Sequence, residues 1–276
     1  MRVAIIGCGY VGSAVARMWH QNGEEVTVTT TTSNKKDTLQ KISSEVLVLT
    51  GDDLWGLKNL VADKDVVLLS VGAKQRTPET YHQAYLETAS NVVAAIRQTG
   101  NVKQLIYTSS YGILGSQKNT IVDETAIPNP RNEYGEILTK TEQVLLSVSE
   151  SEFKTCILRL SGIYGDGREL IKIFRKVAGT TRPGKGEDYT NWIHLEDIVS
   201  AIDFAKQKQL DGIYNLASEQ VLTTKEFFDG LFQAHNLPCV TWDDTQPSNR
   251  PYNMKLSSQK IKDAGYNIIH SQIKFN

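Results

Sequence analysis

Short apolar runs alternate with longer amphipathic segments over the first 160 residues of the chain. The runs are rich in Val, Ile and Leu, as buried parallel strands are, and the segments between them carry apolar residues at helical spacing. This alternation predicts an α/β fold, a doubly wound parallel sheet of the Rossmann type. The predicted strands are Val3–Ile6, Glu25–Thr31, Glu45–Leu49, Asp65–Val71, Val102–Thr108 and Phe153–Leu160, and the main helices are Val11–Gln21, Pro78–Gln98 and Glu133–Ser149.

The regular alternation weakens after residue 161. A helix that ends near Lys208, a strand at Gly212–Leu216, a helix at Thr223–His235 with a capping pair, and a short helix near Leu256–Ala264 are still predicted. We therefore expect residues 1–161 to form the large sheet domain, to which the chain returns at about 192–216. Residues 162–191 and 217–276 are expected to form a smaller C-terminal α/β lobe.

The turn after the first strand has the spacing Gly7-x-Gly9-x-x-Gly12. A strand precedes these glycines and a helix follows, which is the context that a dinucleotide-binding turn requires. Gly7 allows the tight turn, Gly9 lets a pyrophosphate approach the backbone, and Gly12 lets the helix pack against the strand. The alternative is a glycine turn that binds nothing.

The end of the second strand favours NADP over NAD. NAD-specific sites place a carboxylate there to hold the ribose 2′-hydroxyl. This chain has threonines through Thr32, followed by Ser33, Asn34, Lys35 and Lys36, so hydroxyls and cations stand where a 2′-phosphate would lie. The alternative for either lysine is a solvated helix start.

Small and polar residues follow the next strands. Asp52 and Asp53 come after the third strand, where one carboxylate would lie near the adenine and the other would cap a helix. The segment Val71 to Lys74 follows the fourth strand, and its small residues Gly72 and Ala73 suit a crossing cofactor. Ser109 and Ser110 follow the fifth strand, as hydrogen-bond donors or as turn caps.

Composition excludes several classes of protein. The chain has 276 residues and a formal net charge of -1, which gives no sign of nucleic acid or an anionic membrane as partner. No apolar run approaches a membrane span, and we expect no signal peptide before the first strand. Three unpaired cysteines indicate a reducing, cytoplasmic location, and no His, Cys or carboxylate cluster has zinc-like spacing, so no metal is expected.

Taken together, these residues resemble the extended, atypical short-chain dehydrogenase/reductase superfamily, in its NAD-dependent epimerase/dehydratase branch. The order and spacing of several short motifs along nearly the whole chain carry the resemblance. They are the glycine motif, Gly51-Asp52, Ser70 to Lys74, Ser109-Ser110, Val122-Asp123-Glu124, Tyr134-Gly135, Arg159 with Ile163-Tyr164-Gly165, Trp192 to Asp197, and Tyr214-Asn215-Leu216.

The resemblance implies a nucleotide-binding sheet domain and a small lobe that holds the substrate. It implies that Ser110 hydrogen-bonds the reacting oxygen and that Tyr134 passes the proton. Ser161 and Ile163 would flank the nicotinamide, and a homodimer through the helices of Tyr81 and Tyr134 is compatible with it. The expected cofactor-binding residues are Gly7, Gly9, Tyr10, Val11, Gly12, Thr30, Ser33, Asn34, Lys35, Asp52, Asp53, Val71, Gly72, Ala73, Lys74, Ser109, Ser161 and Ile163.

One position departs from the family pattern Tyr-x-x-x-Lys. The chain has Leu138 where the lysine would share a helix face with Tyr134. A free tyrosine titrates near pH ~10, so a phenolate at neutral pH needs a neighbouring cation. Lys74 is our candidate for a substitute, because it would emerge at the same sheet edge. The alternative role for Tyr134 is packing alone.

Two functions remain open. The first is an enzyme that binds NADP(H) or NAD(H) and transfers hydride to or from a nucleotide-sugar-like or small carbonyl or hydroxyl substrate. The second is a catalytically weakened NADP(H) sensor or partner-binding module. His194, Asp197 and Arg159 are expected to be structural, and Arg168, Arg182, Lys185 and Arg250 hold a substrate phosphate or lie on a solvated surface.

Overall fold

The chain folds into two compact units, each built from three separate chain segments. The computed structural model describes residues 1–117, 120–148 and 153–275. The first unit comprises Met1–Ser110, Asn132–Arg159 and Val199–Tyr214. The second comprises Tyr111–Arg131, Leu160–Ile198 and the chain from Asn215 onward. The segment 111–131 was expected in the sheet domain, and the structure assigns it to the second unit instead.

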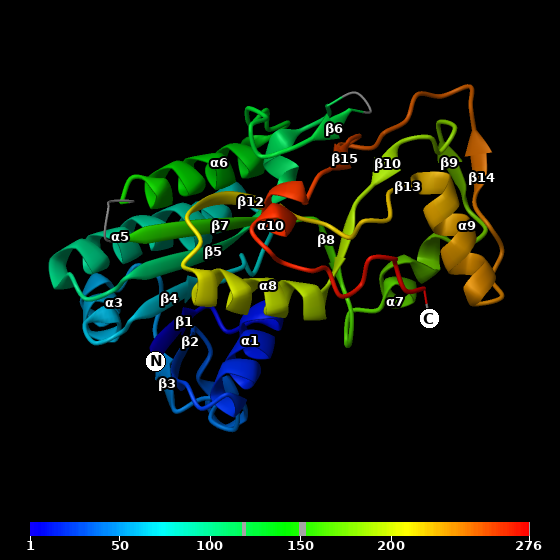
Figure 1. Cartoon of the computed structure of the whole chain (residues 1–276). Helices are drawn as coiled ribbons and strands as arrows, with labels where there is room; N and C mark the ends of the chain where they lie inside the picture. The colour runs from blue at the N-terminus through cyan, green and yellow to red at the C-terminus, as the bar shows by residue number, and fades with distance from the viewer. Residues whose placement is uncertain (118–119, 149–152, 276) are drawn as a thin grey trace. The chain divides into compact units, whose positions relative to one another are not determined.

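A seven-stranded sheet forms the centre of the first unit (Figure 1). Its order is β12-β7-β5-β4-β1-β2-β3, and β1 pairs in parallel with both β2 and β4. The order reverses between β1 and β4, which is the switch point where doubly wound sheets bind ligands. The strands are β1 (Arg2–Ile6), β2 (Glu25–Thr30), β3 (Glu45–Val48), β4 (Val66–Leu69), β5 (Gln104–Ser110), β7 (Lys154–Leu160) and β12 (Gly212–Leu216).

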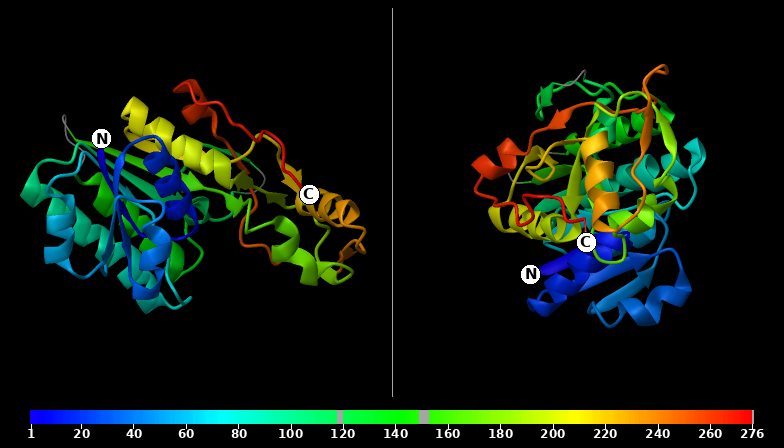
Figure 2. Two further views of the ribbon diagram at one scale, coloured as in Figure 1. Left: turned by 90° about the horizontal axis from the view of Figure 1, so that it is seen from below. Right: turned by 90° about the vertical axis from the view of Figure 1, so that its right-hand side faces the viewer.

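Helices cover both faces of this sheet (Figures 1 and 2). One face carries α3, α5 and α6, whose apolar side chains join those of β1, β4 and β5 in one core cluster. The double covering explains why β4 is buried at every position, as the apolar run predicts. The helical segments are α1 (Tyr10–Gln21), η1 (Ser33–Lys35), α2 (Lys36–Leu39), α3 (Leu54–Val61), α4 (Pro78–Tyr81), η2 (His82–Glu87), α5 (Thr88–Thr99), α6 (Glu133–Leu146) and α8 (Leu195–Lys208).

The opposite face holds α1 and α8, which are joined by a buried polar contact. The Trp19 indole is fully buried, and its Nε1 donates a hydrogen bond to Asp203 at 2.8 Å. Lys206 lies over the same ring, with its Nζ 4.8 Å from the ring centroid, and pairs with Asp203 at 3.0 Å. These contacts tie the part of α8 from Val199 onward to the rest of the first unit.

The second unit is built from short strand pairs around an aromatic core. Phe227, Phe228 and Phe232 on α9 pack with Trp192 and Phe174. The strands pair as β15 with β6, β11 with β8, β14 with β9 and β10 with β13. The elements are η3 (Tyr111–Leu114), β6 (Ile121–Val122), β8 (Gly162–Tyr164), α7 (Leu170–Phe174), η4 (Arg175–Val177), β9 (Thr181–Pro183), β10 (Tyr189–Thr190), β11 (Trp192–His194), β13 (Leu222–Thr223), α9 (Thr224–Ala234), β14 (Thr241–Asp243), β15 (Lys255–Leu256) and α10 (Gln259–Asp263).

Most predicted elements of the sheet lie within a few residues of those observed. The fifth strand continues to Ser110, two residues past its predicted end, because Ser109 is buried in the strand instead of capping a turn. The predicted helix Pro78–Gln98 contains a π-helical segment, η2. Ser149, the predicted end of the helix that begins at Glu133, lies outside the described residues. No helix within the described ranges combines the length and apolar character of a membrane crossing.

Candidate functional site

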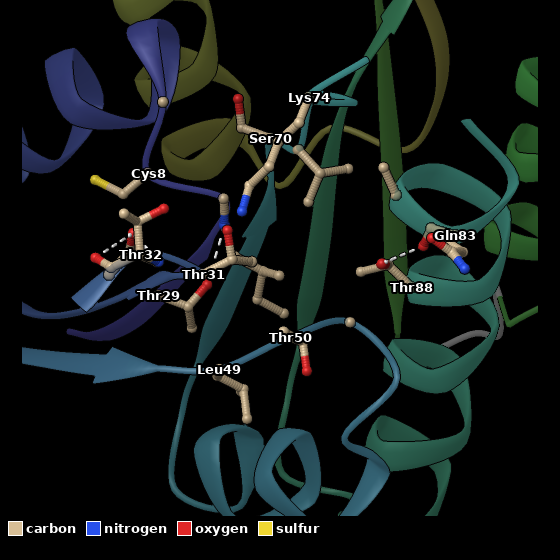
Figure 3. Close-up of a pocket in the computed structure, with 18 of the residues that line it drawn as sticks. Cys8, Thr29, Thr31, Thr32, Leu49, Thr50, Ser70, Lys74, Gln83 and Thr88 are labelled. Carbon is tan, nitrogen blue, oxygen red and sulfur yellow. Dashed lines mark hydrogen bonds between the residues drawn. The ribbon is translucent and has the colours of Figure 1, made fainter. Parts of the chain in front are cut away.

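A cavity of about 570 Å³ opens at the carboxyl edge of the sheet in the first unit (Figure 3). Its size falls within the range of small-molecule and cofactor sites. It lies at the β1/β4 switch point, where a doubly wound sheet binds its ligand. The lining residues are Ile6, Gly7, Cys8, Gly9, Thr29, Thr30, Thr31, Thr32, Lys35, Leu49, Thr50, Gly51, Asp52, Leu57, Ser70, Val71, Gly72, Lys74, Thr80, Gln83, Ala84, Glu87 and Thr88.

The three glycines of the turn after β1 differ in what surrounds them. Gly7 has φ +91°, and a Cβ there would lie 2.6 Å from the Ser70 carbonyl oxygen. A Cβ on Gly12 would lie 2.4 Å from the Gly7 carbonyl oxygen. The fold itself therefore requires both glycines. A Cβ on Gly9 would meet no protein atom within 4 Å, so the absence of a side chain there keeps space open in the cavity.

The start of α1 lies beside this open space. Its N-cap is Gly9, which has no side chain to cap the helix, and the first turn contains no acidic residue. Helix N-termini whose N–H groups are not claimed by a cap attract phosphates, because the peptide dipoles add to the hydrogen bonds. The cavity therefore combines close backbone access with a site that favours negative charge.

The end of β2 lines the cavity with hydroxyls. The Thr29 hydroxyl accepts a hydrogen bond from the Gly7 amide at 3.1 Å, and Thr30 bonds the backbone of Thr32, as Figure 3 shows. Lys35 lines the cavity with Thr30, Thr31 and Thr32. The side of the cavity formed by β2 thus carries a cation and no carboxylate, as the sequence predicted. The predicted residues Ser33 and Asn34 form η1 and stand outside the lining.

The two aspartates after β3 have separate roles. Asp52 lines the cavity, and a hydrogen bond from the Thr50 side chain lowers the pKa of this exposed carboxyl. Asp53 caps α3, because its side chain accepts a hydrogen bond from the Gly56 amide at 2.8 Å. The capping alternative is therefore confirmed for Asp53, which is not among the lining residues.

The helix after β4 forms a wall of the cavity that sequence patterns did not reveal. Its π-helical segment contributes Gln83, Ala84 and Glu87, and Thr88 follows directly. The Thr88 hydroxyl donates to the Gln83 carbonyl at 2.9 Å (Figure 3). A Cβ on Gly51 would lie 1.8 Å from the Thr88 hydroxyl oxygen, so the β3 loop and this helix meet at van der Waals distance. Single-turn π-helices are frequent at functional sites.

The remaining predicted cofactor residues divide into those in the lining and those outside it. Val71, Gly72 and Lys74 line the cavity, whereas Ala73 does not. Tyr10, Val11 and Gly12 belong to the first turn of α1, outside the lining. Ser161 and Ile163 belong to the second unit. Cys8 also lines the cavity, and its thiol stays neutral because burial raises its pKa.

Ser109 belongs to a buried polar network under the sheet edge. Its hydroxyl donates to Glu142 Oε1 at 2.6 Å. Glu142 in turn accepts hydrogen bonds from Arg159, with Nη2 2.8 Å from Oε2 and Nε 3.1 Å from Oε1. Glu142 and Arg159 are 3% and 2% exposed. The predicted structural role of Arg159 is confirmed, and Ser109 is bound to this network instead of facing the cavity.

Tyr134 lies in the first turn of α6 and contacts the segment after β4. Its hydroxyl donates to the Arg76 carbonyl at 2.9 Å. The Arg76 guanidinium carbon lies 5.4 Å from the centroid of the Tyr134 ring, and the Tyr81 ring lies 4.7 Å away. The cation over the Tyr134 ring is therefore Arg76, whereas the predicted substitute Lys74 lines the cofactor cavity. Leu138 stands one helical turn after Tyr134 on α6.

The second unit holds a separate group of cationic residues. Burial lowers the pKa of Arg250. Tyr111 and Asp188 oppose this shift, and the nearby charge of Arg182 adds to it. The Nε of Arg250 is buried without a hydrogen-bond partner among the described residues. Tyr111 lies beside it, and burial raises the pKa of this tyrosine to about 12. Arg168, by contrast, donates to the Ile163 carbonyl at 3.0 Å.

Comparison with known proteins agrees with this geometry. The model of the NAD dependent epimerase/dehydratase family matches residues 3–217. This protein belongs to that family. Protein YeeZ of Escherichia coli strain K12 is 32% identical to this family member over 228 residues, which cover 79% of this chain and 77% of YeeZ.

Solved structures of other proteins share the fold. One is the UDP-glucose 4-epimerase of Thermus thermophilus in complex with NAD, with a TM-score of 0.78 and 21% identity over 98% of this chain and 94% of that one. Another is the UDP-N-acetylglucosamine 4-epimerase of Methanobrevibacter ruminantium M1 in complex with UDP-N-acetylmuramic acid. Its TM-score is 0.80, with 18% identity over 97% of this chain and 92% of that one.

Proposed function

We propose that this protein binds NADP(H), in preference to NAD(H), and is an oxidoreductase or epimerase acting by hydride transfer on a nucleotide-sugar-like or small carbonyl or hydroxyl substrate. The observation that carries the proposal is the difference between the glycines. Gly7 and Gly12 are required by the packing of the chain, but Gly9 is required only if something else occupies the cavity. A pyrophosphate seated at the start of α1 is what this turn accommodates.

The preference for NADP rests on the charges along β2. Lys35 and the threonine hydroxyls line the cavity on that side. They offer a positive charge and hydrogen-bond donors to a 2′-phosphate, and no carboxylate of β2 stands there to bind a free 2′-hydroxyl or repel the phosphate. Asp52 and Glu87 line the cavity on the side of β3 and the π-helix. These acceptors suit the amino group of an adenine.

The proposed chemistry uses Ser110 and Tyr134, with the bound nicotinamide supplying or accepting the hydride. Ser110 holds the reacting oxygen by a hydrogen bond. The Tyr134 hydroxyl passes a proton to or from the same oxygen. We assign to Arg76 the part of the missing lysine, because its guanidinium lies against the Tyr134 ring. Lys74, which lines the cavity, is assigned to the cofactor.

A nucleotide sugar is the substrate class that we favour. Arg182 and Arg250 of the second unit bring together two positive charges, and a buried Nε of Arg250 has no partner among the described residues. A diphosphate would neutralise the two arginine charges and accept a hydrogen bond from the Arg250 Nε. The structural relatives bound to UDP-N-acetylmuramic acid and NAD support this class by analogy of fold.

The first experiment is to titrate the protein with NADPH and NADH separately and then to screen for turnover with sugar nucleotides and aldehydes. We expect tighter binding of NADPH and turnover with at least one nucleotide sugar. Tyr134→Phe is expected to abolish turnover and to leave cofactor affinity nearly unchanged, since Tyr134 is outside the cavity lining. Full turnover in Tyr134→Phe would remove this residue from the mechanism, and binding of neither cofactor would refute the proposal.

A second candidate function is an NADP(H) sensor or partner-binding module with weak catalysis. It is favoured by the hydrogen bond from Tyr134 to the Arg76 carbonyl, which engages the hydroxyl that the reaction requires. Leu138 supports the same view. Cofactor binding without turnover across the whole substrate panel would favour the sensor.

We also propose a cytoplasmic location and a homodimer. A cytoplasmic location is supported by the three cysteines, all of which are free. A homodimer would be detected as a doubled mass in sedimentation equilibrium.

A further inference from the structure

Two histidines and a glutamate come together in the second unit. In the sequence they lie far from the residues that line the cofactor cavity. His194 ends β11, Glu196 lies in the first turn of α8, and His270 belongs to the C-terminal tail. The Nε2 of His270 lies 2.7 Å from Oε2 of Glu196, and the ring centroids of the two histidines are 4.0 Å apart. One ligand atom from each residue lies within 4.8 Å of the other two.

The backbone of the tail is held so that His270 faces the start of α8. The buried carboxylate of Asp197 accepts hydrogen bonds from the amides of Ile269 at 2.6 Å and His270 at 3.1 Å. The Tyr266 hydroxyl donates to the Asp197 carbonyl at 2.9 Å. Asp197 was expected to be structural, and its carboxylate holds the tail. His270 itself is 7% exposed, so its ring has little freedom to leave the cluster.

The ring of His194 is also positioned by its neighbours. Its Nδ1 accepts a hydrogen bond from the Glu196 amide at 3.3 Å, and the Tyr164 ring packs edge-on against it with centroids 5.1 Å apart. Glu196 is the adjustable member, because its side chain is 61% exposed. The two imidazoles are held by their neighbours and the carboxylate can move. An ion would bind His194 at Nδ1 in place of the Glu196 amide hydrogen bond, or at Nε2 after loss of its proton, and would displace the proton that His270 Nε2 shares with Glu196.

We propose that His194, Glu196 and His270 form a binding site for a divalent transition-metal ion of the zinc class. Two imidazole nitrogens and a carboxylate oxygen are ligands that zinc, nickel and cobalt accept, whereas magnesium and calcium prefer oxygen alone. The nearby Asp197 adds a negative charge, and Lys274 adds a positive one. With Glu196 ionised, these side chains leave the site with an excess of negative charge, which favours a cation.

The spacing suits tetrahedral coordination after a small adjustment. Zinc ligands stand at about 2.0–2.1 Å from the ion, so two of them lie about 3.3 Å apart. Glu196 must therefore move away from His270 by a little over half an ångström, which its exposure allows, and ligand atoms that lie up to 4.8 Å apart must approach by up to about 1.5 Å. Three protein ligands leave a fourth position for water or another small ligand. An ion here would join the C-terminal tail to the start of α8.

The test is calorimetric titration of tag-free, chelator-treated protein with Zn²⁺, together with the visible spectrum of the Co²⁺-loaded protein. We expect one ion for each chain and the absorption of tetrahedral Co²⁺. Glu196→Gln is the decisive variant because the residue is exposed and glutamine keeps a hydrogen-bond acceptor for His270. Its Zn²⁺ affinity is expected to fall by about tenfold or more, since even residues that only support metal ligands have effects of that size. His270→Gln is expected to do the same.

His20→Gln is the matched control, since His20 is an exposed histidine of α1 in the first unit. It is expected to bind Zn²⁺ as the unaltered protein does. Equal affinity in the unaltered protein, Glu196→Gln and His270→Gln would overturn the proposal, as would the absence of saturable binding. If His270→Gln fails to fold, Glu196→Gln decides alone. The result does not depend on cofactor binding or turnover, so it is independent of the proposed enzymatic function.

Discussion

Replacement of Lys35 by glutamine tests which cofactor the cavity prefers. Lys35 is exposed and lines the cavity beside the threonines that end β2. If a 2′-phosphate lies there, Lys35→Gln removes a charge interaction that NADPH makes and NADH cannot make. The variant should therefore weaken NADPH binding and leave NADH binding unchanged.

The size of the effect follows from Coulomb's law in water. Two unit charges about 4 Å apart interact by about 1 kcal/mol at the dielectric constant of water. A phosphomonoester carries about 1.5 to 2 negative charges near neutral pH. Screening over a Debye length of about 8 Å at physiological ionic strength reduces the product to about 1 kcal/mol, or about fivefold in affinity. At about 1 M salt the Debye length is about 3 Å, and the difference should shrink to about twofold.

The assay is a fluorescence or calorimetric titration with both cofactors at two salt concentrations. Lys36→Gln is the matched control, because Lys36 is the adjacent exposed lysine and is not among the cavity-lining residues. Our assignment of Lys35 fails if the two variants lose NADPH affinity equally. It also fails if Lys35→Gln weakens NADH as much as NADPH, since NADH has no 2′-phosphate to lose.

Three further predictions concern the turn, the buried ion pair and pH. Gly9→Ala should leave the urea midpoint unchanged and weaken NADPH binding, whereas Gly12→Ala should lower the midpoint because its Cβ meets backbone at 2.4 Å; the reverse pattern would contradict our account of the turn. Glu142→Gln should lower the free energy of unfolding by about 3 kcal/mol or more, because it leaves the buried Arg159 without a counter-charge, and a loss below about 1 kcal/mol in urea unfolding would argue against this. Burial raises the pKa of Glu124 despite a backbone hydrogen bond to its carboxylate, so the ionised carboxylate destabilises the folded protein above that pKa. Glu124→Gln should therefore be more stable than the unaltered protein at pH 7. The gain should vanish as the pH falls to the range where free glutamate is protonated.

Much of the first unit could be predicted because neighbouring residues in the sequence determine its strands and its glycine turn. Apolar runs mark buried strands, and the glycine spacing marks the turn at the switch point of the sheet. The structural role of Arg159 was also expected, and a buried guanidinium requires a counter-charge. The structure adds its identity, Glu142.

Other features depend on contacts that no local pattern encodes. The π-helical turn His82–Glu87 changes the backbone hydrogen bonding within a segment that looks uniformly helical, and it decides which side chains reach the cavity. The cluster of Glu196 and His270 joins positions 74 residues apart, so zinc-like spacing along the chain could not reveal it. The strands of the second unit are two or three residues long, too short for a period to appear.

The division of each unit into three segments has a consequence for synthesis on the ribosome. The strand β12 borders β7 in the sheet, but it is translated some fifty residues later. At about 5–20 residues per second, a nascent chain spends several seconds with the outer edge of β7 unpaired. Such an open edge can pair with a strand of another chain. The yield of folded protein should therefore depend on ribosome-associated chaperones and on the concentration of nascent chains, and not on the stability of the folded protein alone.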